Sequence, residues 1–540
     1  MKKILFASLL FLTTYASAQA VWTPDLGNGK YKNPIVFADY SDPDVIRTGD
    51  DYWMTASSFN CVPGLPMLHS TDLVNWELVN YALPRMYDTD FDAASHGNGV
   101  WAPAIRFHDG WYYIYWGDPD RGIYMVRTQD PRGAWSKPVL VKAAKGIIDT
   151  CPLWDEDGRA YLVHGWAGSR AGFKSVLSVS EMTPDGTELI GEDVLIFDGH
   201  DAHPTVEGPK FYKRNGYYYV FAPAGGVKPG WQIVLRSKSP WGPYECRKVL
   251  HQGDSSVPGP HQGGWVEDVE GNAWFIHFDD RYAYGRILHL QPMAWQPDDW
   301  CIIGIDRNND GIGEPVEQWQ KPASYVKSAV KTPVENDEFA GRTLGLQWQW
   351  HANPQTGWYF TNPTDGELRM YCLRNPEGWK NLWDTPNLLL QKVTAPDCTY
   401  TTKIDFREAY EGDRGGLVMM GKDYALVGVE FRDGKLTLVQ TDCVQADKGK
   451  PEQVNATVPF TGGPVWLRCR IAWKMDDKNV PQMHGQFSYS LNGKKFTDIG
   501  RPFIGREGQW IGAKIGYFAT SEIKKNDGGW MDIDWFHVTK

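Results

Sequence analysis

The chain has 540 residues, with 55 Lys and Arg against 66 Asp and Glu, which gives a formal net charge of −11. An acidic chain without a basic run does not fit a nucleic-acid or anionic-membrane partner, and a neutral ligand is the better expectation. At roughly 150 residues per domain the length allows about three domains, or two if one is a long all-β fold.

The first 18 residues have the pattern of a secretory signal peptide. "MKKILFASLLFLTTYASAQA" has two lysines, an apolar run, and small residues at Ala16 and Ala18, so we expect cleavage after Ala18. The apolar run is shorter than the roughly 20 residues that a membrane span needs, so membrane insertion is not predicted. The sequence therefore predicts export to the periplasm or the exterior and leaves open which of the two.

The cysteines and the aromatic residues indicate which kinds of site the protein can have. Eight cysteines are scattered without a CxxC pair, which disfavours zinc and redox sites and favours buried free thiols. The 26 Trp and 26 Tyr provide core mass, and they also provide flat apolar faces for sugar rings.

A tight turn followed by an aromatic strand recurs five times, from "TGDDYWMTAS" at residue 48 to "VEGNAWFIHFDD" at residue 269. Glycine tolerates the positive φ of such turns, so each segment is a hairpin signal. The turn glycines are Gly49, Gly110, Gly158, Gly216 and Gly271. With about four strands in each of five units, the pattern predicts an all-β, five-bladed β-propeller over residues 19–325.

Acidic residues stand just before three of these hairpins. Asp42 lies seven residues before its turn glycine, and Asp149 and Glu207 each lie nine residues before theirs. Taken singly, each is a turn cap or a solvated residue at the start of a strand. The inner strands of a propeller line one channel, so the three acids are predicted to meet there. Paired carboxylates without a metal, thiol or cofactor motif are typical of glycoside hydrolysis, and partners from opposite blades favour inversion.

Five ordered motifs over about residues 31–325 closely resemble glycoside hydrolase family 43. They are "NPIVFADYSDPDVIRTGDDYWMTASSF", "GVWAPAIRFHDGWYYIYWG", "GIIDTCPLWDEDGRAYLVHGW", "VEGPKFYKRNGYYYVFAPAGG" and "HQGGWVED". The resemblance implies a five-bladed propeller with inverting α-L-arabinofuranosidase, β-xylosidase or arabinanase activity. It also implies that Asp42 is the general base, Glu207 the general acid, and Asp149 the acid that orients and tunes Glu207.

The same resemblance implies substrate contacts by Phe59, Trp101 and Arg286. Core packing for the two aromatic residues and a surface ion pair for Arg286 are the alternatives. His261 matches the family's central-channel histidine, which in some members joins a calcium or water cluster. A hydrogen-bonded buried histidine is the alternative.

One loop has a possible metal-binding pattern. "DRNNDGIGEPVE", residues 306–317, fits the calcium-loop pattern D-x-[DN]-x-[DN]-G-x5-E. Pro315 and the lack of flanking helices favour an ordinary connector. No cofactor or metal ligand is therefore predicted, with a structural calcium as the alternative.

The composition changes near Gln320, and residues 335–540 alternate in the manner of strands, with "RDGK" and "LNGK" turns. This pattern predicts a β-sandwich, and its segments resemble the concanavalin-like domain attached to many family 43 enzymes. Trp348, Trp350 and Trp358 could bind sugar there or pack in the structure, and packing is favoured.

These observations lead to one functional hypothesis and to several alternative functions. We expect an exported, inverting exo-glycosidase that removes terminal α-L-arabinofuranosyl residues from plant cell-wall polysaccharide or its oligosaccharides. A β-xylosidase or bifunctional enzyme is the nearest alternative, followed by an endo-arabinanase. A non-catalytic sugar-binding propeller is the alternative from another class.

Overall fold

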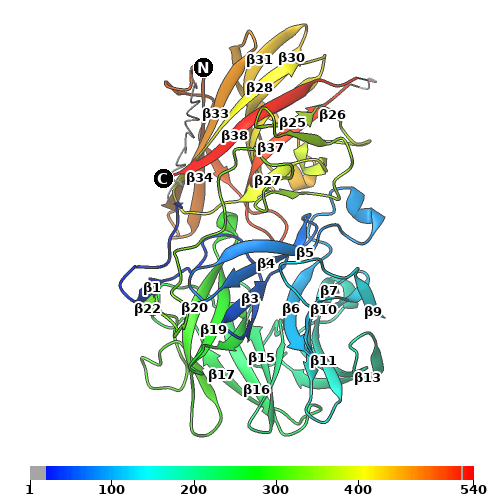
Figure 1. Ribbon diagram of the computed structural model, residues 1–540, viewed down its shortest axis with the longest axis vertical. Coiled ribbons are helices and arrows are strands. Elements are labelled where there is room, and N and C mark those ends of the chain that lie inside the picture. The colour runs from blue at the N-terminus through cyan, green and yellow to red at the C-terminus, as the bar shows by residue number, and fades with distance from the viewer. Residues whose placement is uncertain (1–19, 524–526) are drawn as a thin grey trace, which may run out of the picture.

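The protein was analysed as a computed structural model that describes residues 20–523 and 527–540, and the predicted signal segment lies outside them. It consists of two β domains stacked along the long axis, the N-terminal one below the C-terminal one in Figure 1. Among the described residues, helical structure is confined to short turns: α1 (Gly168–Ala171), η1 (Thr89–Asp92), η2 (Tyr282–Tyr284), η3 (Leu382–Asp384) and η4 (Ala446–Lys448).

The lower domain is the predicted five-bladed propeller, and each blade is an antiparallel sheet of four consecutive strands. Blade 1 contains β2 (Asp44–Thr48), β3 (Asp51–Thr55), β4 (Gly64–Ser70) and β5 (Glu77–Leu83). Blade 2 contains β6 (Trp101–His108), β7 (Trp111–Asp118), β8 (Gly122–Thr128) and β9 (Val139–Ala143). Blade 3 contains β10 (Ile147–Trp154), β11 (Ala160–Trp166), β12 (Val176–Met182) and β13 (Leu189–Asp198). Blade 4 contains β14 (Lys210–Arg214), β15 (Tyr217–Ala224), β16 (Trp231–Ser237) and β17 (Glu245–Leu250). Blade 5 contains β18 (His261–Glu267), β19 (Ala273–Asp280), β20 (Arg286–Trp295) and β21 (Cys301–Ile303).

The five predicted hairpins join the first and second strands of the five blades. Their turn glycines all have positive φ angles, between 63° and 84°. A side chain at these positions would be strained, which explains why glycine marks each turn in the sequence.

The ring is tied together by the ends of the propeller segment. The short strand β1 (Lys30–Lys32) pairs antiparallel with β22 (Gln318–Gln320). Next to this pair, the Asn33 side-chain amide donates to the carbonyls of Leu290 and Val316, both at 2.8 Å. The chain therefore closes the ring by joining its first strand to the segment that leaves blade 5.

The upper domain is the predicted β-sandwich of two eight-stranded sheets. One sheet has the order β23 (Gln349–Trp350), β27 (Leu389–Lys392), β37 (Lys514–Ser521), β29 (Asp413–Met420), β30 (Tyr424–Arg432), β31 (Lys435–Cys443) and β32 (Gln453–Pro459), with β26 (Leu373–Arg374) beside β37. The other has the order β24 (Tyr359–Asn362), β25 (Glu367–Tyr371), β38 (Trp530–Thr539), β28 (Cys398–Glu408), β33 (Pro464–Met475), β34 (Pro481–Ser490) and β35 (Thr497–Asp498), with β36 (Phe503–Gly505) beside β34.

The three tryptophans considered as sugar ligands are part of the sandwich core. Trp348, Trp350 and Trp358 are only 2%, 3% and 7% exposed. The backbone of Trp350 also exchanges two hydrogen bonds with Val62 of the propeller, at 3.0 and 2.6 Å. These residues therefore pack the sandwich and attach it to blade 1, in line with the structural interpretation.

One hydrophobic core continues across the boundary between the domains. Phe37 and Tyr284 of the propeller belong to the same cluster as the sandwich core. Tyr284 lies 4.8 Å from the ring of Trp473, and its hydroxyl donates to the Pro396 carbonyl at 2.9 Å. The two domains are therefore packed as one body.

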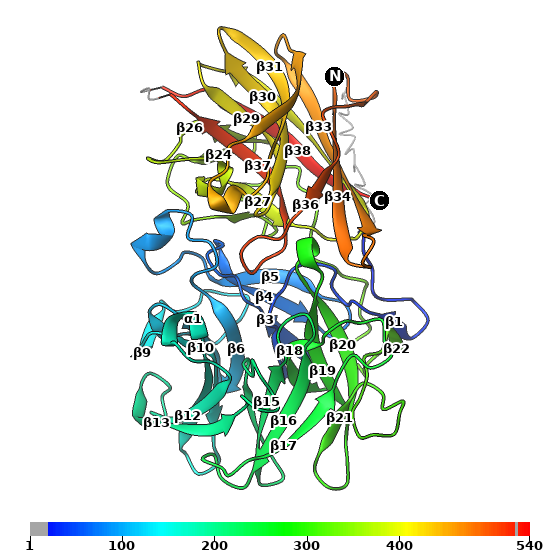
Figure 2. The same cartoon turned by 180° about the vertical axis from the view of Figure 1, so that it is seen from behind.

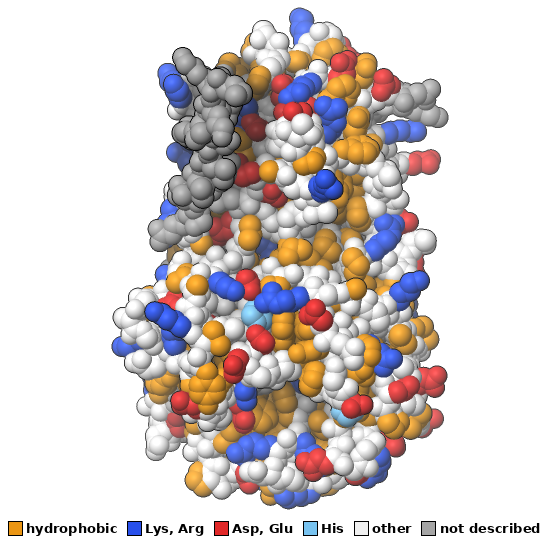
Figure 3. All heavy atoms as spheres, viewed as in Figure 1, with side chains coloured by type: hydrophobic (Ala, Val, Ile, Leu, Met, Phe, Trp, Pro, Cys, Tyr) orange, Lys and Arg blue, Asp and Glu red, His pale blue; other side chains and the backbone are white. Residues whose placement is uncertain are grey.

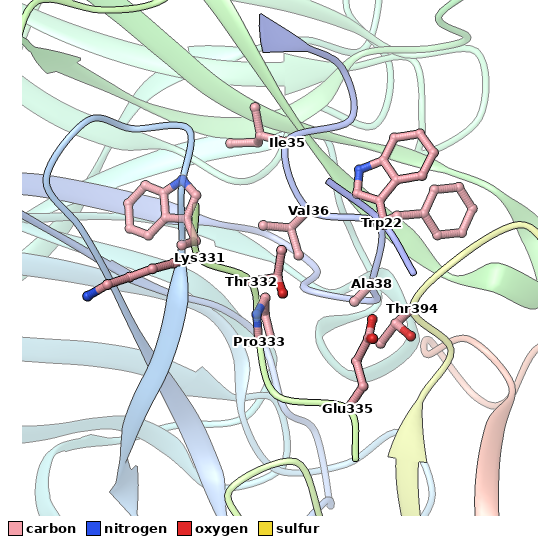
Figure 4. Close-up of a pocket in the computed structure, with 11 residues that line it drawn as sticks. Trp22, Ile35, Val36, Ala38, Lys331, Thr332, Pro333, Glu335 and Thr394 are labelled. Carbon is pink, nitrogen blue, oxygen red and sulfur yellow. The ribbon is translucent and has the colours of Figure 1, made fainter. Parts of the chain in front are cut away.

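A small cavity of about 20 Å³ marks the point where the N-terminal segment, blade 1 and the linker meet (Figure 4). Glu335 and Thr394 lie next to one another beside Ala38. The Glu335 carboxylate accepts the backbone N–H of Val21 at 3.2 Å. Burial raises the pKa of Glu335 above its usual value.

Several smaller predictions can be compared with the structure. All eight cysteines carry free thiols and seven of them are buried, as expected. In the loop after β21, the Asp306 carboxylate accepts backbone N–H groups of its own loop, and Glu314 is buried against Arg307. Among the described residues no helix has the length and apolar character to cross a bilayer. Acidic and basic side chains are interspersed over the face shown in Figure 3.

Candidate active site

Each blade has a residue in the left-handed backbone region near the start of its first strand, either just before the strand or within its first three residues. The φ angles are 54° at Asp42, 35° at Ala102, 60° at Asp149, 56° at Gly208 and 36° at Gln262. In blades 2, 3 and 5 the ladder is also irregular at this point. Such bulges redirect side chains next to functional sites. The repeated irregularity turns the starts of the inner strands toward one pocket.

This pocket has a volume of about 240 Å³. It is lined by Asp42, Phe59, Trp101, Ala102, Ile148, Asp149, Thr205, Glu207, Gly226, Val227, Gln262, Arg286 and Trp510. The structure thus brings together the three acids predicted from the sequence, one each from blades 1, 3 and 4. The three acids lie at the same end of the propeller because they stand near equivalent starts of the inner strands.

Asp42 is held from one side by two hydroxyl groups. Its Oδ2 accepts hydrogen bonds from Ser41 Oγ and Ser57 Oγ, both at 2.6 Å. Arg286 Nη1 lies 3.5 Å from its other oxygen, Oδ1. Hydrogen bonds from hydroxyls to a carboxylate are short and strong, so the orientation of Asp42 is well defined.

Asp149 is a deeply buried acid with a strongly perturbed pKa. Burial raises its pKa well above the ordinary value, and the nearby carboxylates of Glu207 and Asp42 raise it further. One backbone hydrogen bond opposes this effect, because Gly208 N–H donates to Asp149 Oδ2 at 2.8 Å. Strong perturbation by burial and a specific charged partner, inside a pocket, is typical of functional carboxyl groups.

Glu207 is the most accessible acid, and His261 supports it. His261 Nε2 lies 3.1 Å from Glu207 Oε1, and the histidine side chain is fully buried. His261 is not among the residues that line the pocket, and its contact with substrate stays a prediction. The start of β18 lies against the segment before β14, since a Cβ at Gly208 would be 2.5 Å from the Gln262 side chain. The alternative of a hydrogen-bonded buried histidine describes it better.

The other three predicted contact residues do line the pocket. Arg286 is buried and donates from Nη1 to Ser41 Oγ at 2.7 Å, so it is not a surface residue. Phe59 packs edge-on against Trp101 at 6.2 Å, and the Trp101 indole donates to the Gly97 carbonyl at 2.8 Å. These contacts give the pocket one cationic wall and one aromatic wall.

Trp510 reaches the pocket from the sandwich and was missed by the sequence analysis. Its loop, residues 506–513 between β36 and β37, comes down onto the propeller (Figure 2). Trp510 lies 5.9 Å from the ring of Trp101. Asp39 anchors the loop, because its Oδ2 accepts Gly512 N–H at 2.9 Å while its Oδ1 accepts Arg286 N–H at 2.8 Å. No local pattern in the sequence indicates which propeller residue Trp510 meets.

Gln262 was also missed. It is buried, lines the pocket, and its Nε2 has no hydrogen-bond partner among the described residues. Its only signal in the sequence is its place directly after His261, at the strand start that is equivalent to those of the three acids.

The described residues contain no group of three or more His, Cys, Asp or Glu side chains that could hold a metal ion. What the pocket offers is three carboxyl groups with different partners, one guanidinium group and aromatic walls. Carboxylates that flank a small pocket are the chemical equipment of glycoside hydrolases. Fold and site together define that class of protein.

Comparison with known proteins identifies the family. The sequence profile described as Glycosyl hydrolases family 43 matches residues 31–301, and that of the Beta xylosidase C-terminal Concanavalin A-like domain matches residues 336–539. The chain therefore belongs to glycoside hydrolase family 43 and is a glycoside hydrolase with this type of sandwich.

Relatives of two kinds cover nearly the whole chain. A putative beta-xylosidase of Xylanibacter ruminicola is 36% identical over 92% of this chain and 87% of its own length. A non-reducing end alpha-L-arabinofuranosidase of Bacteroides ovatus is 29% identical over 95% of both chains. The crystal structure of a xylan beta-1,4-xylosidase from Bacillus halodurans has the same fold, with a TM-score of 0.82 at 24% identity, over 94% of this chain and all of that chain.

Proposed function

We propose that this protein is an inverting, exo-acting glycosidase that releases single terminal pentosyl residues from plant cell-wall oligosaccharides or polysaccharides. The observation that carries the proposal is the pocket of about 240 Å³ that holds three acids and is bounded by Trp510 of the second domain. Pockets for drug-sized ligands measure roughly 300–1,000 Å³. A smaller pocket that Trp510 bounds on one side suits a single sugar ring better than the middle of a polysaccharide chain. This argues against an endo-arabinanase.

The proposed roles follow from the surroundings of each acid. Asp42 removes a proton from the attacking water, and Glu207 gives a proton to the leaving oxygen. Asp149 orients and tunes Glu207, supported by the electrostatic coupling between the two groups. In an inverting enzyme the two carboxyl groups act in one displacement and are roughly 6.5–9.5 Å apart, which leaves room for the water.

Terminal β-D-xylosyl residues are the first candidate for the substrate, and α-L-arabinofuranosyl residues are the second. From the sequence alone we expected the opposite order. Relatives named as beta-xylosidases are 36% and 31% identical to this chain, and the relative named as an arabinofuranosidase is 29% identical. Two pentoses present similar hydroxyl groups to one small pocket, so a bifunctional enzyme is compatible with the site.

The deciding experiment compares hydrolysis of aryl β-D-xyloside and aryl α-L-arabinofuranoside by the purified protein, with Asp42→Ala as the blank. Faster hydrolysis of the xyloside, absent in Asp42→Ala, supports xylosyl residues as the first substrate. Faster hydrolysis of the arabinofuranoside would make arabinofuranosyl residues the first substrate instead. NMR of the first product formed tests inversion at the anomeric carbon. Tight binding of xylobiose without any turnover would instead indicate the non-catalytic sugar-binding propeller.

Two further parts of the proposal concern the setting of the enzyme. We propose export from the cytoplasm, on the basis of the N-terminal segment "MKKILFASLLFLTTYASAQA". We also propose catalysis without a metal cofactor, so activity should persist after dialysis against EDTA. If added calcium restored activity or raised the melting temperature of the dialysed protein, the loop at residues 306–317 would become the candidate calcium site.

A further inference from the structure

Two serines approach the same oxygen of Asp42. Ser41 is the neighbour of Asp42 in the chain, and Ser57 follows β3. Both are buried, at 1% and 3% exposure, and both donate to Asp42 Oδ2 at 2.6 Å. Within the part of the chain that the structure describes, no hydrogen bond reaches Asp42 Oδ1. The two oxygens of this carboxylate therefore have different surroundings.

The direction of both hydroxyl protons is fixed by a second partner of each serine. Arg286 Nη1 donates to Ser41 Oγ at 2.7 Å, and the backbone N–H of Ala102 donates to Ser57 Oγ at 2.7 Å. A guanidinium group and a backbone N–H can only donate. Each serine must therefore use its single proton for Asp42. All four hydrogen bonds can form only when Oδ2 of Asp42 accepts from both serines and itself carries no proton.

We propose that Ser41 and Ser57 are positioning residues that reserve Oδ2 of Asp42 for hydrogen bonds and leave Oδ1 as the oxygen that removes the proton from water. The inference rests on the proposed function of Asp42 as the base. In the reaction step, a water proton moves to Oδ1 while the water oxygen bonds to the anomeric carbon. The glycosidic bond breaks, and its electron pair leaves on the oxygen that Glu207 protonates.

The charged groups around Asp42 come from three further elements. Arg286 of β20 lies 3.5 Å from Oδ1, and Asp149 of β10 is electrostatically coupled to Asp42. Glu207, before β14, lines the same pocket. Ser41 connects Arg286 with Asp42, and Ser57 connects the start of β6 with Asp42. Blades 1, 2 and 5 thus all contribute to the orientation of one carboxylate.

The test uses Ser41→Ala, Ser57→Ala and the double variant, with Ser58→Ala as the matched control. Ser58 is equally buried and adjacent in the chain, but its hydroxyl oxygen accepts Leu65 N–H instead of meeting Asp42. We expect kcat/KM to fall about 10-fold in each single variant, and further in the double variant, toward the roughly 10²–10⁴-fold loss of a missing base. The control should keep wild-type kcat/KM.

Two readouts separate positioning from a merely structural role. Losing a hydrogen bond to the charged carboxylate should move the acidic limb of the pH profile of kcat/KM to higher pH, by about one unit. The loss should be the same factor for aryl glycosides and for xylobiose, because the base acts in the same step for every leaving group. A fall in melting temperature with an unmoved pH profile would overturn the proposal.

A third readout does not depend on turnover. In protein labelled with ¹³C at aspartate carboxyl groups, Asp42→Asn identifies the Asp42 signal. That signal should titrate at higher pH in both serine variants and at the wild-type pH in Ser58→Ala. An unchanged titration would overturn the serine proposal even if the enzyme is active. Absence of any glycosidase activity in the wild type, with the titration shifted, would instead overturn the proposed function.

Discussion

At the scale of single residues, the three acids of the pocket differ in what surrounds them. Asp42 accepts two serine hydroxyls, Asp149 accepts one backbone N–H and is otherwise desolvated, and Glu207 contacts a buried histidine. Neighbouring carboxyl groups in unlike environments take different protonation states and so different tasks. The proposed division into base, tuning acid and proton donor rests on these contacts.

Replacing Glu207 by Ala should slow substrates in proportion to their need for an acid. For xylobiose, whose leaving group is a poor one, we expect kcat/KM to fall by about 10²–10⁴-fold. For an aryl glycoside with an acidic phenol as leaving group, the fall should be much smaller. Glu156→Ala is the control, because the Glu156 side chain is 90% exposed. Equal slowing of both substrates would remove Glu207 from the role of general acid.

Replacing Asp149 by Asn should stabilise the protein at neutral pH while it lowers activity. The folded-state pKa of Asp149 is raised by burial and by its two acidic neighbours. The folded state then holds more protons than the unfolded state, so stability falls as pH rises from the unfolded pKa toward the raised one. Asparagine avoids this loss and should raise the melting temperature at pH 7, by roughly 1 °C for each kcal/mol recovered in a cooperative unit of this size.

Asp157→Asn is the matched control for that experiment. Asp157 is exposed, and its bonds to Arg159 lower its pKa, which is the opposite shift. Its replacement should not raise the melting temperature. If Asp149→Asn also left the melting temperature at pH 7 unchanged or lower, the charge on Asp149 would not be a source of strain in the folded state.

At the scale of elements, one loop of the sandwich completes the site of the propeller. Residues 506–513 carry Trp510 to the pocket, and Asp39 ties this loop to Arg286 through its two carboxylate oxygens. Gly512 is required at this contact, because a Cβ there would lie 2.8 Å from the backbone of Tyr284 and Gly285. The loop can therefore lie directly on the backbone of blade 5.

Removing the Trp510 side chain should weaken substrate binding more than chemistry. In Trp510→Ala we expect KM to rise about 10-fold, which corresponds to about 1.4 kcal/mol, because the indole offers a flat apolar face to a sugar ring. We expect kcat to change much less. Trp319→Ala is the control, because Trp319 is 36% exposed, similar to the 44% of Trp510, and lies in β22. Asp39→Asn should change KM in the same direction. An unchanged KM in Trp510→Ala would show that the loop does not contact substrate.

At the scale of the whole molecule, the propeller and the sandwich share one hydrophobic cluster and several backbone hydrogen bonds. Domains that share a large hydrophobic interface behave as one unit. We therefore expect one calorimetric transition for the intact chain. Tyr284→Ala removes the contacts with Trp473 and Pro396, and should either broaden this transition or divide it into two. Two separate transitions in the wild type would contradict the prediction.

The sequence by itself determined the features that depend on neighbouring residues. The turn glycines from Gly49 to Gly271 marked five hairpins, because only glycine adopts such turns without strain. The similar distances before these turns, seven, nine and nine residues, then placed Asp42, Asp149 and Glu207 near equivalent strand starts, and the propeller brought them together. The repeated motifs were also sufficient to indicate the family.

The tertiary structure decided what depends on contacts between distant segments. Trp510 meets Trp101 across more than 400 residues of chain, and His261 contacts Glu207 without lining the pocket. The two serines on Asp42 owe their fixed hydroxyl directions to donors from other blades. Local patterns cannot predict such contacts, because they arise only when the blades and the sandwich pack against one another.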